Sequence, residues 1–261
     1  MTALLELRGV AVRFGGITAV DGLSLRVHPG EIVGLIGPNG AGKTVTFNVV
    51  TGLQRPTEGR VLLHGRVVTT APPHVRTAMG LGRTFQVLQL FRGMSVRENL
   101  MVAAHRHTRS SALADALRLP ARRRALAEAR ERADAVLDFL GLDDLAAVPT
   151  DQLTIGQARL VELARAVTLR PDLLLLDEPA SGLDPSETAD FARLLAEVRS
   201  VVGCGMLLVE HDMSVVMPLS DHVVAMSFGR VLAEGAPEHV RSHPAVLASY
   251  LGGDDHAGVP A

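Results

Sequence analysis

One stretch, Gly37-Pro38-Asn39-Gly40-Ala41-Gly42-Lys43-Thr44, constrains the fold of this 261-residue chain more than any other. Its pattern, G-x-x-x-x-G-K-[ST], is that of a phosphate-binding loop. Glycines allow a tight turn that points backbone N–H groups at phosphate oxygens, and the following helix presents its positive end to the same anion. Lys43 is expected to reach the β- and γ-phosphates, and Thr44 to ligate Mg²⁺. An ordinary Gly-rich turn is the alternative, which the apolar run before the loop and the helix-compatible run after it disfavour.

The composition excludes several classes of protein. Hydrophobic residues make up 47% of the chain, enough to build a sizeable core. The net charge of −2 gives no basic field for a nucleic-acid partner. Cys204 is the only cysteine, which excludes an internal disulfide, fits a reducing compartment, and is expected to be a small buried residue. We find no apolar run long enough to cross a bilayer and no signal peptide, so we expect a soluble cytoplasmic chain.

Alternating apolar residues over 4–12 and 23–27 predict two strands of an antiparallel sheet at the amino end. Phe14 lies in the glycine-containing turn between them. It either closes the edge of the core or forms a stacking platform for a purine ring, and the residues alone leave both open. Farther along, residues 82–86 are expected to form a strand that ends in Gln86.

The pattern becomes helical between residues 87 and 152. Ser95 and Glu98 have capping-box spacing at the start of one helix, and a second helix is expected over 122–140. We therefore predict a helical insert between two α/β halves. The run Arg122-Arg123-Arg124 is expected to be a solvated helix face, with contact to anionic lipid headgroups as the alternative.

The α/β pattern resumes at residues 154–157, and a helix follows that Pro171 ends. Four leucines over 173–176 predict a central parallel strand buried on both faces, and 206–209 predict a second one. Ligands in such sheets bind beyond the carboxyl ends of the strands, where the loop at Gly37 and several polar residues fall. Those residues are Gln86, Asp177, Glu178 and His211.

Each polar residue at these strand ends has an expected role. Asp177 is placed to hold Mg²⁺, directly or through water. Glu178, one residue on, could orient or deprotonate an attacking water, and His211 could sense the γ-phosphate. Beyond them, a hairpin is expected around Gly229, and Pro237 and Pro244 begin short helices. The residues after 252 have the composition of a disordered tail.

Together these residues occur in the order found in the ATP-binding subunits of ABC transporters, which the chain resembles from residue 4 to about 252. The discriminating piece is Leu153-Thr154-Ile155-Gly156-Gln157, which is similar to the Leu-Ser-Gly-Gly-Gln signature of that family. The segment Ser181-Gly182-Leu183-Asp184 also matches. The resemblance implies an α/β fold: a P-loop NTPase (RecA-like) core with an amino-terminal antiparallel β-subdomain and an inserted α-helical subdomain.

The resemblance also implies domain boundaries. The ATPase domain would span 1–252, with a nucleotide-binding core at 1–86 and 159–236. The helical subdomain with the signature would be 87–158, and the terminal helices 237–252. A flexible tail would follow at 253–261.

The implied cofactors are ATP and Mg²⁺, and each matching residue carries a role. Phe14 would stack on adenine. The phosphates would be held by Gly37, Pro38, Asn39, Gly40, Ala41, Gly42, Lys43, Thr44 and the Val45 N–H. Gln86 would touch Mg²⁺ or the lytic water and lead into the surface that meets the membrane partner. Thr154, Gly156 and Gln157 would contact the γ-phosphate of ATP bound to an opposing subunit, and Asp184 would bridge the two subunits. Glu178 with His211 would drive hydrolysis.

Three positions depart from the family pattern. Thr154 replaces a serine but keeps its hydroxyl. Val45 stands where a second hydroxyl residue is common, so a side-chain bond to the α-phosphate is lost there. Ala158 replaces a longer polar residue.

More narrowly, residues 82–86, the insert around Arg122-Arg123-Arg124 and the ending Ser249-Tyr250-Leu251-Gly252-Gly253 resemble the longer ATPase subunit of branched-chain amino-acid importers. The implied partners are a second ATPase subunit (identical or different), two transmembrane permeases, and a periplasmic or lipid-anchored solute-binding protein acting through them. The chain would then lie on the inner face of the cell membrane.

Other functions stay open at this point. Related subunits serve urea or amide importers and a lipopolysaccharide exporter. A non-transport ABC ATPase acting on ribosomes or DNA usually brings tandem units or coiled coils, which this chain lacks. A small-molecule P-loop kinase is disfavoured by the signature.

Overall fold

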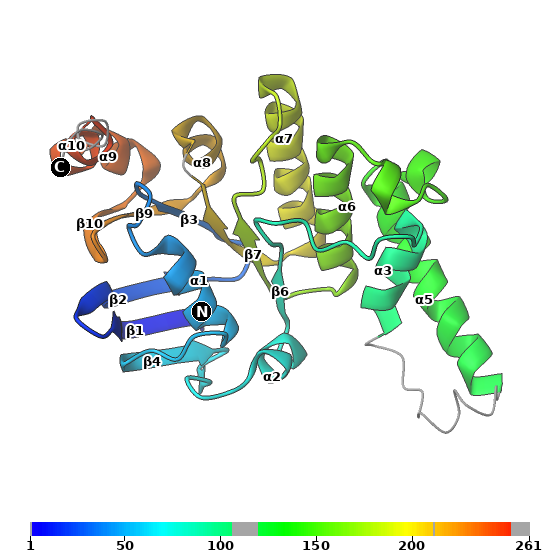
Figure 1. The fold of residues 1–261 in the computed structure, drawn as a ribbon, viewed down its shortest axis with the longest axis horizontal. Helices are drawn as coiled ribbons and strands as arrows, with labels where there is room; N and C mark the ends of the chain where they lie inside the picture. The colour runs from blue at the N-terminus through cyan, green and yellow to red at the C-terminus, as the bar shows by residue number, and fades with distance from the viewer. Residues whose placement is uncertain (1, 106–119, 211, 252–261) are drawn as a thin grey trace, which may run out of the picture. The chain divides into compact units, whose positions relative to one another are not determined.

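The computed structural model describes residues 2–105, 120–210 and 212–251 (Figure 1). The chain divides into two compact units: residues 1–83, 172–178 and 196–261 form the first, and residues 84–171 and 179–195 form the second. The predicted core–insert boundary at 158/159 falls inside helix α6 (Ile155–Thr168). Because α6 is one continuous helix packed on α3 (Val96–His105) and α5 (Pro120–Phe139), the whole of it belongs to the second unit.

The first unit contains the predicted antiparallel sheet. Its strands run in the order β2 (Ile17–Val27), β1 (Leu5–Phe14), β4 (Glu58–Leu63) and β5 (Arg66–Val67). β1 and β2 are longer than the predicted strands, because register shifts after Leu7 and Val10 interrupt the alternation from which the strands were predicted. The two-residue turn at Gly15 and Gly16 joins them into a hairpin that begins at Phe14.

The same unit contains a six-stranded sheet. The order is β10 (Arg230–Gly235), β9 (His222–Ser227), β3 (Ile32–Ile36), β8 (Gly205–Val209), β7 (Leu173–Asp177) and β6 (Leu81–Arg83). Only the β9–β10 pair is antiparallel, and it is the hairpin expected around Gly229. Every residue of β3, β7 and β8 is buried, as continuous apolar runs predict for central parallel strands.

Helices complete the first unit. α1 (Lys43–Thr51) packs between the two sheets, with contacts to β2 and β7 (Figure 1). Its Phe47 side chain is fully buried in a core cluster that strands of both sheets share. The other helices of this unit are α2 (Pro73–Ala78), α8 (Met213–Leu219), α9 (Pro237–Ser242) and α10 (Pro244–Leu251).

Two predictions about this unit are confirmed and one element was missed. Pro237 and Pro244 begin α9 and α10 as expected. Cys204 is buried, and burial raises the pKa of its thiol to about 11, so it is not a reactive thiolate. The short helix α8 was not predicted, since its seven residues include Pro218 and give little periodic signal. The predicted tail lies outside the described residues.

The second unit contains α3, α5, α6, two short 3₁₀ turns (Asp143–Leu145 and Thr150–Gln152) and the start of α7 (Pro185–Val202). The predicted capping box is present at α3: Ser95 N donates to Glu98 Oε2 at 2.8 Å, and Glu98 N donates to Ser95 Oγ at 3.2 Å. On α5, exposed Arg124 pairs with Glu128. Across the described parts of both units, no helix is long and apolar enough to cross a membrane.

Candidate functional site

The predicted phosphate-binding loop connects the end of β3 to the start of α1. Gly37 has φ 151°, and a Cβ added there would lie 2.2 Å from the Met226 carbonyl oxygen. Gly42 has φ 102°, and its Cβ would lie 2.5 Å from the Ala19 carbonyl oxygen. Both positions therefore require glycine, because the loop is held tightly between β9 and β2.

Lys43, the only lysine in the chain, is the first residue of α1 and is 6% exposed. Its Nζ donates to the carbonyl oxygens of Gly37 at 2.6 Å and Pro38 at 3.0 Å. Burial lowers the pKa of Lys43, and the charges of Glu178 and Asp177 oppose that shift. The loop and the acidic end of β7 therefore lie close enough to form one electrostatic site within the first unit.

The next two residues of α1 have different surroundings. Thr44 is exposed on the first turn of the helix, so its hydroxyl is accessible to a ligand. Val45 is half-buried and packs against the core cluster. The departure from a hydroxyl residue at position 45 therefore adds apolar packing beneath the loop.

Asp177 is the last residue of β7 and is 3% exposed. Its Oδ2 accepts from Arg83 Nη2 at 2.8 Å, and Arg83 Nη1 donates to Asn48 Oδ1 of α1 at 3.1 Å. Arg83, from β6, thus links the acidic strand end to the phosphate-loop helix. Sequence reasoning gave Arg83 no role at the site, although an arginine inside a predicted strand was a usable signal.

Glu178 follows directly and has φ 46°, in the left-handed region that residues other than glycine seldom adopt. Its backbone N–H donates to the Val209 carbonyl oxygen at 2.9 Å, which fixes this conformation beyond the strand. Backbone strain of this kind occurs at functional sites, where the surrounding structure holds it in place. Asp177 and Glu178 therefore have different backbone conformations, which suits two carboxylates with different tasks.

Phe14 ends β1 at the hairpin turn and is 48% exposed, and Ile17, its partner in the ladder, is 71% exposed. A ring that only closed the edge of the core would be buried. The exposed pair offers an apolar surface of the kind on which a planar ring can stack.

In the second unit, Thr154 is the N-cap of α6. Its Oγ1 accepts from Gln157 N at 3.2 Å, and Gln157 Oε1 accepts from Thr154 N at 3.0 Å. These side chains thus form a capping box, which the sequence reasoning did not foresee. Gly156 lies against Glu187, because a Cβ there would be 2.6 Å from Glu187 Oε1.

Asp184 has a similar local role at α7. Its Oδ1 accepts from the backbone N–H groups of Ser186 at 2.7 Å and Glu187 at 2.8 Å. Glu187 Oε2 in turn accepts from Asp184 N at 3.0 Å. The 181–184 segment lies beside α6, with Ile155 Cγ2 3.3 Å from a Cβ built at Gly182. The signature and this segment are therefore neighbours within one unit.

The structure does not place Gln86 at the end of a strand. Gln86 was expected to end a strand, but β6 ends at Arg83, and Gln86 is exposed in an irregular segment. The physical reason is that the main chain from Phe85 onward binds side chains of α6 and no longer pairs with β7. His211 lies outside the described residues.

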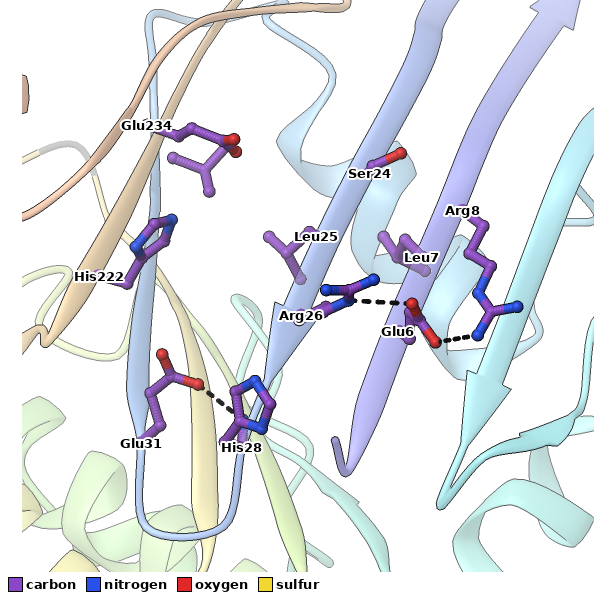
Figure 2. A pocket seen from close by; sticks show the side chains of 11 residues that line it. Glu6, Leu7, Arg8, Ser24, Leu25, Arg26, His28, Glu31, His222 and Glu234 are labelled. Atoms are coloured by element: carbon purple, nitrogen blue, oxygen red, sulfur yellow. Dashed lines mark hydrogen bonds and ion pairs between the residues drawn. The ribbon is translucent and has the colours of Figure 1, made fainter. Parts of the chain in front are cut away.

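A hollow of about 450 Å³ lies elsewhere in the first unit, among β1, β2, β9 and β10. Figure 2 shows Glu6 between two arginines: its carboxylate accepts from Arg26 Nε at 2.9 Å and Arg8 Nη2 at 2.6 Å. Glu31 Oε2 accepts from the His28 backbone N–H at 2.6 Å. None of the residues predicted to bind nucleotide lines this hollow.

Comparison with known proteins decides the family. The model of the ABC transporter family matches residues 20–181. The chain belongs to this family. Its members carry the ATP-binding cassette, so this ABC protein is an ATP-binding transport ATPase. A second model, described as "Branched-chain amino acid ATP-binding cassette transporter", matches residues 230–256.

Curated relatives span almost the whole ABC chain. The "High-affinity branched-chain amino acid transport ATP-binding protein BraF" of Pseudomonas aeruginosa is 45% identical over 249 residues, covering 95% of this chain and 98% of the relative. LivG of Escherichia coli, with the same description, is 43% identical over the same shares. A probable LivG of Archaeoglobus fulgidus is 34% identical over 97% of this chain and 96% of its own.

Solved structures agree with the fold prediction. A nucleotide-free ATP-binding cassette from an ABC transporter has a TM-score of 0.83 and 31% identity, covering 95% of this chain and 98% of its own. A cassette in its ADP conformation also has a TM-score of 0.83 and 31% identity, covering 97% of this chain and all of its own. The predicted P-loop NTPase fold is therefore confirmed.

Proposed function

We propose that this ABC ATPase hydrolyses ATP to power an importer of branched-chain amino acids. The observation that carries the proposal is that two comparisons, with curated relatives and with a family model, name the same substrate class. Relatives matched over 98% of their length are named for branched-chain amino-acid transport, and the description of the family model that matches 230–256 names the same substrate class. The P-loop and the acidic strand end supply the chemistry such a subunit needs.

The nucleotide would bind in the first unit. The N–H groups of 37–45 and the Lys43 ammonium would hold the phosphates, and Phe14 would stack on adenine. The residues expected at the cation, Thr44, Asp177 and Gln86, offer only oxygen ligands, which Mg²⁺ prefers. The described residues contain no cluster of three or more His, Cys, Asp or Glu suited to a metal. A cation here would therefore depend on the nucleotide phosphates and water for its other ligands.

Hydrolysis would depend on the residues beyond the end of β7. Mg²⁺, when bound, neutralises charge on the phosphates. Glu178 would accept a proton from the attacking water, with Gln86 and His211 orienting the water and the γ-phosphate. The left-handed backbone of Glu178 supports this role, because it fixes the direction in which the side chain leaves the end of the strand.

The second unit would complete the site of another subunit. We propose that Thr154, Gly156 and Gln157, at the positive end of α6, contact the γ-phosphate of ATP on an opposing ATPase subunit. Asp184 would contact that subunit. The proximity of α6 to the 181–184 segment supports a shared surface. Head-to-tail dimerisation would close on ATP and reopen after hydrolysis.

The remaining partners would be two permeases and a solute-binding protein that acts through them at the inner face of the membrane. The segment after Gln86 supports a permease contact, because Val87 is 72% and Phe91 47% exposed. A neighbouring hollow of about 330 Å³ within the second unit has a mixed lining: apolar residues that include Leu88 and Leu90, and polar ones that include Arg92 and Asp151. Exposed apolar side chains beside polar ones, as at Val87 and Phe91, are typical of a protein interface.

Two substitutions test the site. Glu178→Gln should bind ATP and lose at least about a hundredfold in turnover, because the proton acceptor is removed. Lys43→Ala should weaken ATP binding by about tenfold or more, since a charge-assisted contact to phosphate is lost. Exposed Glu58→Gln is the matched control for the amide substitution. Near-normal turnover of Glu178→Gln, or unchanged affinity of Lys43→Ala, would reject the respective assignment.

The substrate class needs a separate measurement. Uptake of labelled leucine, urea and short amides is compared between a deletion strain, the same strain complemented with the chain, and one complemented with Glu178→Gln. Loss and rescue of leucine uptake alone is the expected result. Loss of urea or amide uptake with normal leucine uptake would overturn the substrate assignment while leaving the ATPase role intact.

A further inference from the structure

Three charged residues of α6 contact the main chain of the irregular segment 85–89. Arg159 is 7% exposed; its Nη1 donates to the Phe85 carbonyl oxygen at 3.1 Å and its Nη2 to the Gln86 carbonyl oxygen at 2.9 Å. A single guanidinium therefore binds two consecutive carbonyl groups, one of them belonging to the glutamine of the proposed site. Its planar fork suits this geometry, which lysine could not reproduce.

Glu162, about one turn farther along α6, binds the same segment as a hydrogen-bond acceptor, whereas Arg159 binds it as a donor. The carboxylate is 2% exposed, and its Oε1 accepts from the Phe85 N–H at 3.2 Å. Burial raises the pKa of Glu162, while hydrogen bonds from the Phe85 and Gln89 backbone amides and the charges of Arg159 and Arg165 oppose the rise. Glu162 Oε2 also lies 3.6 Å from Arg159 Nη1. One buried carboxylate thus faces both ends of the segment.

Arg165, three residues farther, contacts the end of the segment. Its Nη1 donates to the Gln89 carbonyl oxygen, and its guanidinium lies over the Phe91 ring, 5.9 Å from the centroid. The Phe91 main chain is held in turn by buried Asn99 of α3, which both accepts from its N–H at 2.8 Å and donates to its carbonyl oxygen at 3.2 Å. Residues spaced by three follow one another along a helix, so α6 presents a continuous polar ridge to this segment.

A segment without secondary structure would ordinarily leave its main-chain groups to water. Here charged side chains satisfy several of them, and two of those side chains are buried. Burying ionic groups is costly unless they are paired and hydrogen-bonded, so their use on this short segment indicates a demand for one conformation. The helix that supplies them is the one whose first turn is the signature.

We infer that Arg159, Glu162 and Arg165 are positioning residues that hold the main chain of segment 85–89 to α6, so that Gln86 and the signature move as one body. The inference rests on the proposed function of Gln86 and of the signature. Any partner that displaces the exposed Val87 side chain would thereby move the start of α6 as well. ATP binding at the phosphate loop would be independent of these contacts, because that loop is anchored by the first unit's own strands.

The test compares hydrogen exchange and kinetics in the full chain. In Glu162→Gln and Arg159→Lys, amide exchange of peptides covering 84–91 is expected to accelerate about tenfold or more, with exchange over 43–51 unchanged. Turnover should fall about tenfold or more while ATP affinity stays within about twofold, because misplacement of Gln86 affects the reacting geometry and leaves the phosphate loop intact. If these residues only stabilised the fold, their loss would not lower turnover while leaving ATP affinity unchanged.

Glu98→Gln is the matched control, since Glu98 is a carboxylate of the same unit that also accepts from a backbone amide, at α3. It should leave exchange over 84–91 and turnover unchanged. Unchanged exchange over 84–91 in both α6 variants, or an equal acceleration in Glu98→Gln, would overturn the inference. If either α6 variant fails to fold, the other decides. Failure of the unaltered chain to bind ATP would instead reject the proposed function, and the exchange result would still decide whether α6 holds the segment.

Discussion

Replacing Arg76 by methionine should be one of the most destabilising single changes in the first unit. The guanidinium is 1% exposed and donates to four main-chain carbonyl oxygens: Val49 at 2.6 Å, Val50 at 2.8 Å, Ala71 at 3.0 Å and Thr69 at 3.1 Å. Two of these carbonyls lie in the last turn of α1, so Arg76 binds the negative end of the helix whose other end is the phosphate loop. Burial lowers the pKa of Arg76 to about 10, yet it stays charged at neutral pH.

The magnitude follows from the carbonyl groups that lose their donor. All four carbonyls lose their bond to Arg76, but Val49 O keeps a second partner, the Gly52 N–H at 3.2 Å, so we count three as losing their donor. Each buried acceptor without a donor costs about 1–3 kcal/mol, and local relaxation should keep the sum near the low end, about 3–5 kcal/mol. Methionine approximates the length of the aliphatic part, so a large cavity does not dominate. The loss of stability in Arg76→Lys should lie between zero and that of Arg76→Met, because lysine keeps the charge but lacks the planar fork of the guanidinium.

Urea unfolding, with hydrogen exchange over 43–51 as the local probe, measures this effect. For a chain of this size the loss corresponds to a fall in Tm of about 6–20 °C. Arg26→Met is the control: Arg26 pairs with the Glu6 carboxylate, but its side chain is 67% exposed, so a loss of only about 0–1 kcal/mol is expected. A loss below about 1 kcal/mol in Arg76→Met, or equal losses in both variants, would refute the reasoning.

Two further predictions concern α6. Thr154→Ala should lower the free energy of unfolding of the second unit by about 0.5–2 kcal/mol and Thr154→Ser should restore it, because the serine hydroxyl can still cap the helix; equal urea midpoints for all three forms would contradict the cap. Burial raises the pKa of Glu162, so the folded chain binds the Glu162 proton more readily than the unfolded chain does. The protonated carboxyl therefore contributes fully to the free energy of unfolding below about pH 4.5, and this contribution is lost as pH rises through the raised pKa. Glu162→Gln should lack that part of the pH profile, and parallel profiles of variant and unaltered chain would show that burial does not shift this carboxyl.

The elements with strong local signals could be predicted from the sequence. The leucine run over 173–176 became β7, and the Ser95–Glu98 spacing became a capping box with both reciprocal bonds. The phosphate loop lies between β3 and α1 as predicted. These features depend on residues close together in the chain, which is why periodicity and spacing suffice for them.

Other features depend on contacts between distant residues. The ion pair of Arg83 with Asp177 spans two strands, and two of the four bonds of Arg76 reach back to α1, so no local pattern reveals the partners of either arginine. Gln86 was placed at a strand end because its neighbours are β-compatible, whereas contacts with α6 end the strand at Arg83. The capping box of Thr154 and Gln157, by contrast, is a local feature whose spacing is visible in the sequence. It was not predicted, because the resemblance of these residues to the family signature favoured a phosphate-binding role.

Since Lys43 is the only lysine, the ε-amine of the phosphate loop is chemically unique in this chain. Reagents that acylate amines have two targets, this group and the α-amino terminus, so a mass increase on the peptide containing residue 43 reports on the loop without any engineered label. The two carbonyl bonds of Nζ restrain it, and its lowered pKa raises the share of reactive free amine. If the nucleotide binds as proposed, the loop carries its own probe of nucleotide occupancy, readable in mixtures where turnover cannot be measured.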